Sequence, residues 1–287
     1  MFLATHGVIW KSTGSLFLNP DFAYSFRKVI STATVSCRVR RSSDNTEQDI
    51  GFVGNDLDNT SLSTFVGSGN GFVVKIYDQK GSGKDLAQTT ASLQFQIVNA
   101  GIIHTINGKT TCVTTSTKWM LTPYTLYPFA TTDSNSIFSV TQPISQVGGG
   151  FNVDFLFSVG TGSLGTDRLF DNYILGSAGN PTSYGIGINQ GASSISTAYS
   201  SGTKLQSSLF KNNEQKYYLN NSLIGTNTTA MSATSNTVGL IVNNTSWSIG
   251  STASSNMYFS EIIIYKSYQN TTISDINTNI NSYYSIY

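Results

Sequence analysis

The chain has 287 residues and a formal net charge of +1, and only 11% of its residues are charged. A balance this close to neutral gives no electrostatic basis for binding nucleic acid or an anionic membrane surface. No stretch of the sequence approaches the roughly 18 consecutive apolar residues of a membrane-spanning helix.

The composition favours an all-β fold. Aromatic residues make up 12% of the chain, glycine is frequent at 26 residues, and proline is scarce at 5. β-Branched and aromatic residues recur in short runs between turns rich in Gly, Asn and Ser, a pattern typical of strands. Many short strands with a turn about every ten residues predict a two-sheet antiparallel β-sandwich with a few short helices. We expect an arm at residues 1–18 and one sandwich domain at residues 19–287.

The N-terminal stretch has apolar groups without the basic segment of a secretory signal. Its apolar side chains are Phe2, Leu3, Val8, Ile9 and Trp10. They are too apolar for a free solvated tail, so residues 1–18 are expected to attach the protein to a neighbouring subunit or a partner.

The next segments mix helix and strand signals. Residues 20–30 follow an Asn/Asp cap signal and predict a short helix. Val35, Cys37 and Val39 alternate with polar residues, which predicts a strand.

That strand carries a concentrated block of charge. Arg38, Arg40 and Arg41 lie within four positions, next to Asp44 and Asp49 in a cluster of turn formers. The block has three readings: a catalytic site, a ligand-binding patch or a structural ion network. We favour the network, in which these arginines pair with Asp44, Asp49 or Asp78 and brace the loops, because a planar guanidinium fixes the geometry of a carboxylate pair.

A second polar cluster follows at residues 77–83. Residues 72–77 alternate as a strand, and Gly81 and Gly83 then form a tight loop. Beside these glycines, Tyr77, Asp78 and Gln79 are candidates for a site that binds a polar ligand. Just before this strand, the spacing of Leu62, Phe65 and Val66 predicts a short helix that ends at Gly67.

The second half contains the clearest strands. Residues 151–159 alternate apolar side chains, and residues 246–251 predict another strand. Asn220 and Asn221 suit a hairpin turn with positive φ. Residues 257–265 are apolar on both faces and predict a central strand. Ile273, Ile276 and Ile280 have helical spacing and predict a terminal helix.

Two cysteines, Cys37 and Cys112, are too few to stabilise a chain of this size by disulfides, and we expect two free buried thiols rather than a disulfide.

His6 and His104 are far apart and lack carboxylates or cysteines at ligand spacing, so no metal site or Ser-His-Asp relay is expected. No Gly-Lys-Ser/Thr follows Gly81 and Gly83, so the loop is not a phosphate cradle. We predict no cofactor.

Residues 20–118 resemble the catalytic domain of α-L-arabinofuranosidase B. The resemblance rests on RVRRSSDNTEQDIGF (38–52) and FVVKIYDQKGSGKDLAQ (72–88), where Tyr77-Asp78-Gln79, Gly81 and Gly83 fall at the spacing of that family. It covers under half of the chain and implies a glycoside hydrolase on a β-sandwich.

The second half resembles laminin-G and concanavalin A-like lectin sandwiches, through YYLNNSLIGT (217–226) and WSIGS…YFSEIIIY (247–265). This resemblance implies a jelly-roll sandwich and carbohydrate binding. The opening MFLATHG and the final NINSYYSIY are similar to virion proteins of tailed bacteriophages that reuse this fold, which implies a virion location, other virion proteins as partners and a homo-oligomer.

The sequence shows no clear pair of catalytic carboxylates for the hydrolase hypothesis. Glycoside hydrolysis needs two carboxyl groups across the sugar. After the Tyr77 loop the sequence offers Glu214, in a turn, and Glu261, in the expected return strand. Asp167 and Asp171 are weak candidates for the acid, so no catalytic residues are predicted.

Aromatic side chains that are able to stack on sugars are more often core residues in such sandwiches. They are Tyr124, Tyr127, Tyr184, Tyr199 and Trp247. Three hypotheses therefore remain: a phage virion structural protein (capsid decoration, head fibre or tail component) that contacts host or environmental glycans, a lectin-like carbohydrate-binding module, and an arabinofuranosidase-like hydrolase.

Overall fold

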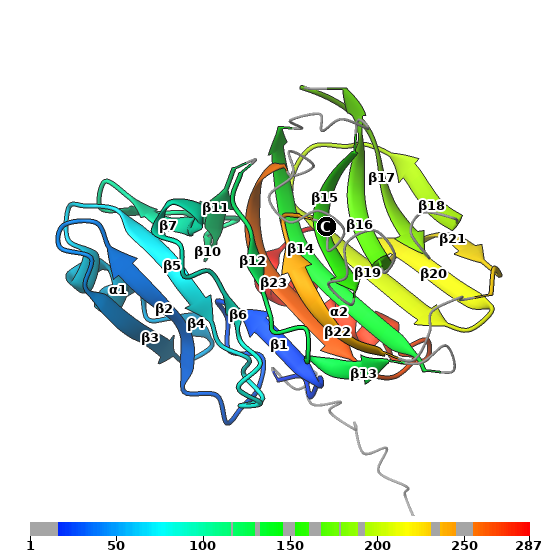
Figure 1. The fold of residues 1–287 in the computed structure, drawn as a ribbon, viewed down its shortest axis with the longest axis horizontal. Helices are drawn as coiled ribbons and strands as arrows, with labels where there is room; N and C mark the ends of the chain where they lie inside the picture. Colours follow the sequence, from blue (N-terminus) through cyan, green and yellow to red (C-terminus); the bar gives the residue numbers. More distant parts are fainter. Residues whose placement is uncertain are drawn as a thin grey trace, which may run out of the picture.

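The computed structural model describes residues 17–115, 117–129, 133–145, 153–160, 168–177, 179–188, 193–230, 236–244 and 255–287. Strands dominate these residues, and they build a smaller lobe, at the left of Figure 1, beside a larger β-sandwich. The predicted all-β antiparallel sandwich is confirmed. None of the helices described is long and apolar enough to cross a membrane.

The smaller lobe is formed by the first part of the chain. Its elements are β2 (Val35–Arg41), β3 (Glu47–Val53), β4 (Asp56–Leu57), α1 (Asn59–Val66), β5 (Gly71–Ile76), β6 (Leu86–Ala87), the 3-10 turn Ala91–Leu93, β7 (Phe95–Asn99), β8 (Ile102–Ile103), β9 (Thr105–Ile106) and β10 (Lys109–Thr110). In its sheet β2 lies between β3 and β5, and β5 also pairs with β6 and β7.

The sandwich takes β1 from the start of the chain and the remaining elements from its later part. They are β1 (Phe22–Ser25), β11 (Cys112–Thr114), β12 (Met120–Leu121), β13 (Tyr127–Phe129), β14 (Asn135–Ser145), β15 (Val153–Gly160), β16 (Arg168–Ser177), β17 (Asn180–Ile188), β18 (Ser193–Ala198), β19 (Lys204–Lys211), β20 (Glu214–Leu219), β21 (Ser222–Asn227), β22 (Asn236–Val242), β23 (Asn256–Tyr265) and α2 (Ile273–Tyr284). One sheet runs β21-β20-β19-β14-β23, and the other runs β22-β15-β16-β17-β18.

β23 is a central strand, as its sequence predicts. It pairs with β14 on one side and with β1 and β11 on the other. Ile262 and Ile264 belong to the main hydrophobic cluster, whereas Ile263 and Tyr265 belong to a second cluster that includes α2. Both faces of the strand are therefore covered, and this explains its unbroken apolar run.

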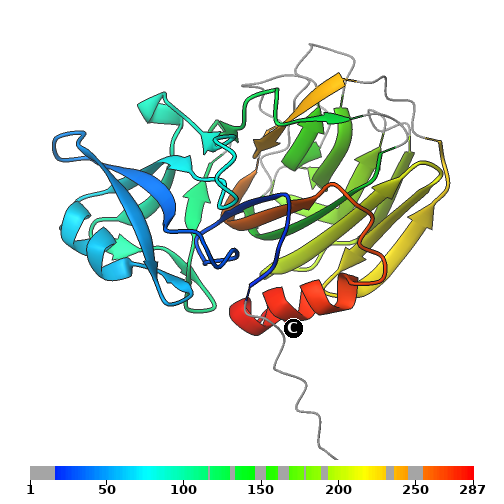
Figure 2. The same cartoon turned by 90° about the horizontal axis from the view of Figure 1, so that it is seen from below.

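The terminal helix α2 covers the outer face of this sheet, and Figure 2 shows it beneath the sandwich. The predicted isoleucines Ile273, Ile276 and Ile280 are all buried there. The predicted helix before Gly67 is also confirmed as α1, whose first turn is capped by the Asp58 carboxylate accepting a hydrogen bond from the Ser61 N–H at 2.9 Å.

The helix predicted at residues 20–30 is wrong, because the structure has strand β1 there. Phe22, Tyr24 and Phe26 alternate and all join the main cluster, while Ala23 joins the cluster under α2. The period is two, so the segment is a strand covered on both faces.

Other predicted elements lie where the patterns put them. Asn220 and Asn221 have φ of 49° and 65° in the β20–β21 hairpin. Gly81 and Gly83 have φ of 75° and 72°. The strand predicted at residues 246–251 lies outside the described residues, as do residues 1–16 of the arm predicted at residues 1–18, and the arm's attachment role stays a prediction. One hydrophobic cluster runs through both lobes, and the single-domain assignment stays a prediction as well.

Candidate functional site

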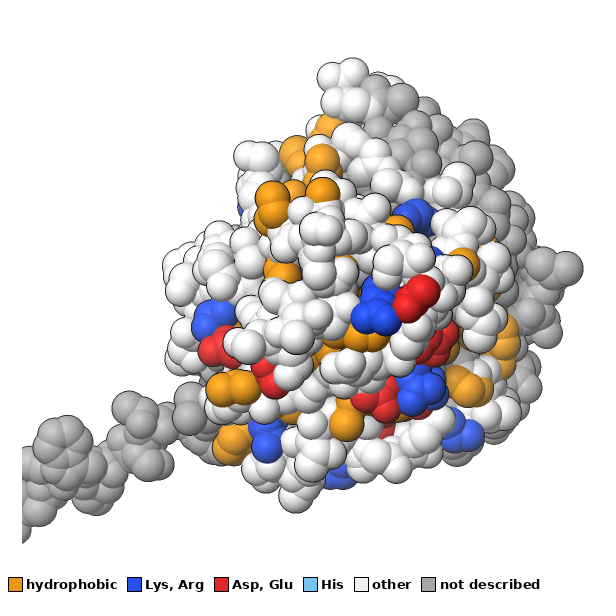
Figure 3. All heavy atoms as spheres, turned by 90° about the vertical axis from the view of Figure 1, so that its left-hand side faces the viewer, with side chains coloured by type: hydrophobic (Ala, Val, Ile, Leu, Met, Phe, Trp, Pro, Cys, Tyr) orange, Lys and Arg blue, Asp and Glu red, His pale blue; other side chains and the backbone are white. Residues whose placement is uncertain are grey.

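The outer face of the smaller lobe collects polar and aromatic side chains. Along β2, Cys37 and Val39 are buried in the main cluster, so Arg38 and Arg40 point to the other side. In register, Arg38 lies opposite Asp49 on β3 and Lys75 on β5. Lys and Arg side chains lie next to Asp and Glu on the face seen in Figure 3, so neither sign of charge dominates it.

Arg38 and Asp49 form a bidentate pair at the surface. The Nε and Nη2 groups of Arg38 donate to the two Asp49 oxygens at 2.7 and 2.9 Å, and the Tyr77 hydroxyl donates to Asp49 at 2.8 Å. The two charged side chains remain 40% and 39% exposed. The hydrogen bond from Arg38 lowers the pKa of Asp49, and burial together with Asp49 raises the pKa of Tyr77 to about 12.

Arg41 pairs with Asp44 across the β2–β3 turn, at 2.7 and 2.9 Å. The Thr46 N–H also donates to the Asp44 carboxylate at 3.0 Å. The hydrogen bond from Arg41 leads the interactions that lower the pKa of Asp44. This pair closes the hairpin and, like the first, lies at the surface.

Among the residues that the structure describes, Arg40 has no carboxylate partner, although the ion network requires one. It donates to neutral acceptors, namely Gln94 Oε1 at 2.9 Å, Asn45 Oδ1 at 2.7 Å and the Ala91 carbonyl at 3.4 Å. Its guanidinium lies 4.8 Å from the centroid of the Phe72 ring. The arginines thus form two separate exposed pairs and one cation held by amides.

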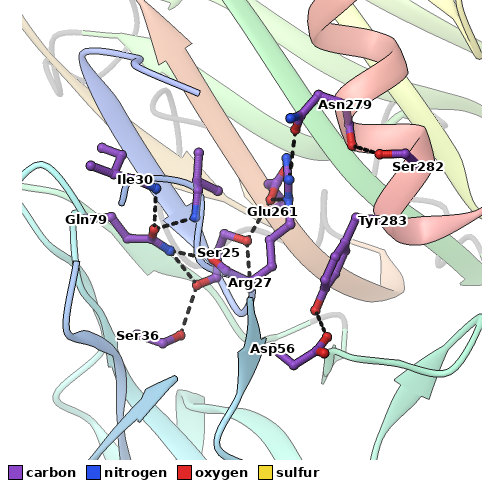
Figure 4. Close-up of polar contacts among 11 residues, drawn as sticks. Ser25, Arg27, Ile30, Ser36, Asp56, Gln79, Glu261, Asn279, Ser282 and Tyr283 are labelled. Carbon is purple, nitrogen blue, oxygen red and sulfur yellow. Dashed lines mark hydrogen bonds and ion pairs between the residues drawn. The ribbon is translucent and has the colours of Figure 1, made fainter. Parts of the chain in front are cut away.

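Asp78 and Gln79 are turned into the protein, with exposures of only 4% and 5%. The Asp78 carboxylate accepts hydrogen bonds from the N–H groups of Ala23, Lys80 and Ser82, so it organises its own loop instead of pairing with an arginine. Gln79 bonds to four backbone groups of residues 25–30, part of which is drawn in Figure 4. Of the three predicted ligand-binding residues, only Tyr77 has its polar atom at the outer face, and the binding role stays a prediction.

A pocket of about 370 Å³ opens where the smaller lobe meets the sandwich. It is lined by β5, β6 and β12, which lie side by side in Figure 1. Its polar side includes Lys75 and Asp85, whose charged atoms are 3.1 Å apart, and the Lys75 ammonium lies 5.0 Å from the Tyr77 ring centroid. Half-buried Trp119 and Leu121 contribute apolar surface.

Trp119 carries no signal in the sequence. It lies between Lys118 and the short strand β12, where no periodic pattern marks it. Of the aromatic residues that were considered, Tyr184 is fully buried and stacks on Tyr199 at 5.0 Å between ring centroids, which fits a core role. Trp247 lies outside the described residues.

The Glu261 side chain is fully buried and accepts hydrogen bonds from its neighbours. Its carboxylate accepts bonds from Arg27 Nε at 2.7 Å, Arg27 Nη2 at 3.0 Å and the Ser25 hydroxyl at 2.7 Å, as Figure 4 shows. Arg27 also donates to Asn279 on α2 and faces the Tyr283 ring. Burial alone would lower the pKa of Arg27, but Glu261 raises it, and the net shift is upward.

Glu214 lies at the turn between β19 and β20. Lys211 and Lys216 donate to it and lower its pKa to about 2, which leaves it without a proton to give at neutral pH. Asp171 is buried at 2% exposure on β16, and Asp167 lies outside the described residues. Both glutamates are thus paired with cations of the protein itself, Glu261 with Arg27 and Glu214 with two lysines.

Cys37 and Cys112 are both free and buried, as predicted. Burial raises the pKa of Cys37 to about 12 and also raises that of Cys112. Within the described ranges, no three side chains of the kinds that ligate metals come together.

No protein-family model matches the sequence, and no curated protein matches it. Solved structures do match. One is a GH54 α-L-arabinofuranosidase soaked with a cyclic sulfate inhibitor, with a TM-score of 0.72 and 15% identity over 90% of this chain and 62% of that one. Another is an arabinofuranosidase complexed with arabinofuranosyl-α-1,2-xylobiose, with a TM-score of 0.66 and 15% identity over 90% of this chain and 61% of that one.

This chain therefore spans under two thirds of the length of these arabinofuranosidases. At 15% identity the likeness shows a shared fold and does not carry their activity over. It extends well beyond residues 20–118, where the sequence resemblance was found. The protein has the β-sandwich fold of GH54 arabinofuranosidases.

Proposed function

We propose that the protein binds glycans without hydrolysing them. The observation that carries this proposal is the pocket in which half-buried Trp119 lies beside the Lys75–Asp85 pair. A sugar presents a C–H face that stacks on an aromatic ring and an edge of hydroxyl groups that need donors and acceptors. The pocket offers both kinds of surface, and its volume falls within the range of small-ligand sites.

The state of the acidic residues supports the absence of hydrolysis. Retaining and inverting glycosidases place two carboxyl groups roughly 5 to 9.5 Å apart, one of them poised to give a proton. Glu261 is instead neutralised by Arg27, and Glu214 is held ionised by two lysines.

The test is binding of the purified protein to an immobilised glycan library, with Trp119→Ala as the variant. Loss of binding in this variant, with retention in Tyr287→Ala, which alters an exposed aromatic residue near α2, supports the pocket. Binding that survives Trp119→Ala unchanged contradicts it. If the protein releases nitrophenol from an aryl arabinofuranoside and Glu214→Gln abolishes this release, the result supports the hydrolase hypothesis instead.

We further propose that this glycan-binding protein is a structural part of a phage virion, as a capsid decoration, head fibre or tail component. The similarity of the two chain ends to phage virion proteins supports this setting, with residues 1–18 contacting other virion proteins in a homo-oligomer. Mass spectrometry of purified particles tests it, since a protein absent from the particles has no virion role.

A further inference from the structure

Two cations share one aromatic ring beside the pocket. The Arg40 guanidinium lies 4.8 Å and the Lys118 ammonium 5.6 Å from the centroid of Phe72. Burial lowers the pKa of Lys118, and the nearby Arg40 charge lowers it further. The two like charges therefore repel each other, and this repulsion costs free energy in the unliganded protein.

No carboxylate of the described residues neutralises this pair. The acidic groups nearby already form ion pairs with other cations: Asp49 with Arg38, Asp44 with Arg41 and Asp85 with Lys75. Glu47 lies opposite Arg40 in the strand register, but it is exposed and its carboxylate is not within ion-pair distance of Arg40.

Arg40 and Lys118 also have N–H groups that are not used in hydrogen bonds to the described residues. Arg40 uses one N–H each toward Gln94, Asn45 and the Ala91 carbonyl, and a guanidinium has further N–H groups beyond these. The Lys118 ammonium donates to no acceptor within the described part of the chain, although it is half-buried.

A chain of buried amides fixes this arrangement relative to the pocket. Gln94, 1% exposed, accepts from Arg40 and donates to the Gln88 carbonyl at 3.1 Å. Gln88 lines the pocket and donates to the Trp119 carbonyl at 2.9 Å. Lys118 directly precedes Trp119, so the two cations are held next to the pocket wall by the same segments that form it.

We propose that Arg40, Phe72 and Lys118 form an anion subsite that selects glycans bearing a carboxylate or sulfate group. The inference rests on the proposed glycan binding, and it names the class of sugar. An anion that contacts both cations would receive charge-assisted hydrogen bonds from each and relieve their repulsion. The sugar ring that carries it would reach the Trp119 pocket.

The experiment compares matched oligosaccharides that differ only in charge, oligogalacturonate and its methyl ester, together with sulfated and unsulfated forms of one galactan. The full chain is expected to bind the charged member of at least one pair about tenfold more tightly. Lys118→Gln should abolish this preference while binding to the neutral member is retained. Lys266→Gln, which alters an exposed lysine near the end of β23, should keep the preference.

The outcomes separate the two proposals. Equal binding to charged and neutral members overturns the anion subsite alone. Absence of binding to any glycan overturns the proposed function and the subsite with it. If inorganic sulfate alone competes with the charged oligosaccharide at equal concentration, the subsite binds free anions and its assignment to glycans is wrong.

Discussion

The buried pair of Arg27 and Glu261 gives the sharpest prediction on stability. Both side chains are almost fully buried, at 3% and 0% exposure, and they are joined by two hydrogen bonds of 2.7 and 3.0 Å. Glu261→Gln preserves the shape of the side chain but leaves the guanidinium charge without a counter-charge. Breaking a buried pair in this way costs about 3 to 5 kcal/mol, because the remaining charge is still removed from water.

Unfolding in guanidinium chloride, followed by tryptophan fluorescence and circular dichroism, measures this cost. With a denaturant slope of about 4 kcal/mol per M, the midpoint should fall by roughly 1 M. Asp49→Asn is the matched control, because it removes a bidentate pair whose members are 40% and 39% exposed. Such a surface pair contributes within about 1 kcal/mol.

A second variant separates charge from packing. Replacing both Arg27 and Glu261 by Met removes the buried charges together, so it should recover part of the stability that Glu261→Gln loses. If Glu261→Gln unfolds at the same midpoint as Asp49→Asn, the reasoning from burial is refuted.

Two further predictions concern the core and the strands. Because burial raises the pKa of Cys37 to about 12, the native protein should not react with a thiol reagent at roughly pH 8, and unfolding should expose both thiols. The folded state holds the Cys37 proton more tightly than the unfolded state, because burial raises the pKa of this thiol. The stability that the protonated thiol contributes is therefore complete below pH 9 and is lost as the pH rises toward 12. A free energy of unfolding that stays constant over that window contradicts the shift. Gly51→Ala places a Cβ atom 2.7 Å from the Thr34 carbonyl oxygen, so the strand must move and the thermal midpoint should fall by the equivalent of about 1 to 3 kcal/mol. An unchanged midpoint would mean that β3 relaxes freely at this point.

The sequence predicts most of the elements that have local signals. The isoleucine spacing of α2, the spacing of Leu62, Phe65 and Val66 in α1, and the paired asparagines 220 and 221 each carry their information within a few residues. At β1 two local signals conflict: the Asn/Asp cap predicts a helix, whereas the alternation of Phe22, Tyr24 and Phe26 predicts the strand that the structure has.

The candidate site was less predictable because its groups meet only in the folded chain. Arg27 and Glu261 are 234 positions apart, and neither has a neighbour in sequence that marks the pair. Arg40, Phe72 and Lys118 come from three separate segments. The charge block at residues 38–49 is visible in the sequence. The sequence does not show that Arg40 donates to amide oxygens while Arg38 and Arg41 pair with carboxylates.

The position of β23 has a consequence for how the chain folds. Phe22 pairs with Ile264, a separation of 242 residues (264 − 22). The same strand also separates β14 from β11. Until residues 256–265 have left the ribosome, β1, β11 and β14 lack the neighbour that all three share. Pairings this distant in sequence slow folding, since the loop must close before any contact offsets its entropy. During synthesis the exposed edges of those strands are therefore open to misassembly and to chaperones.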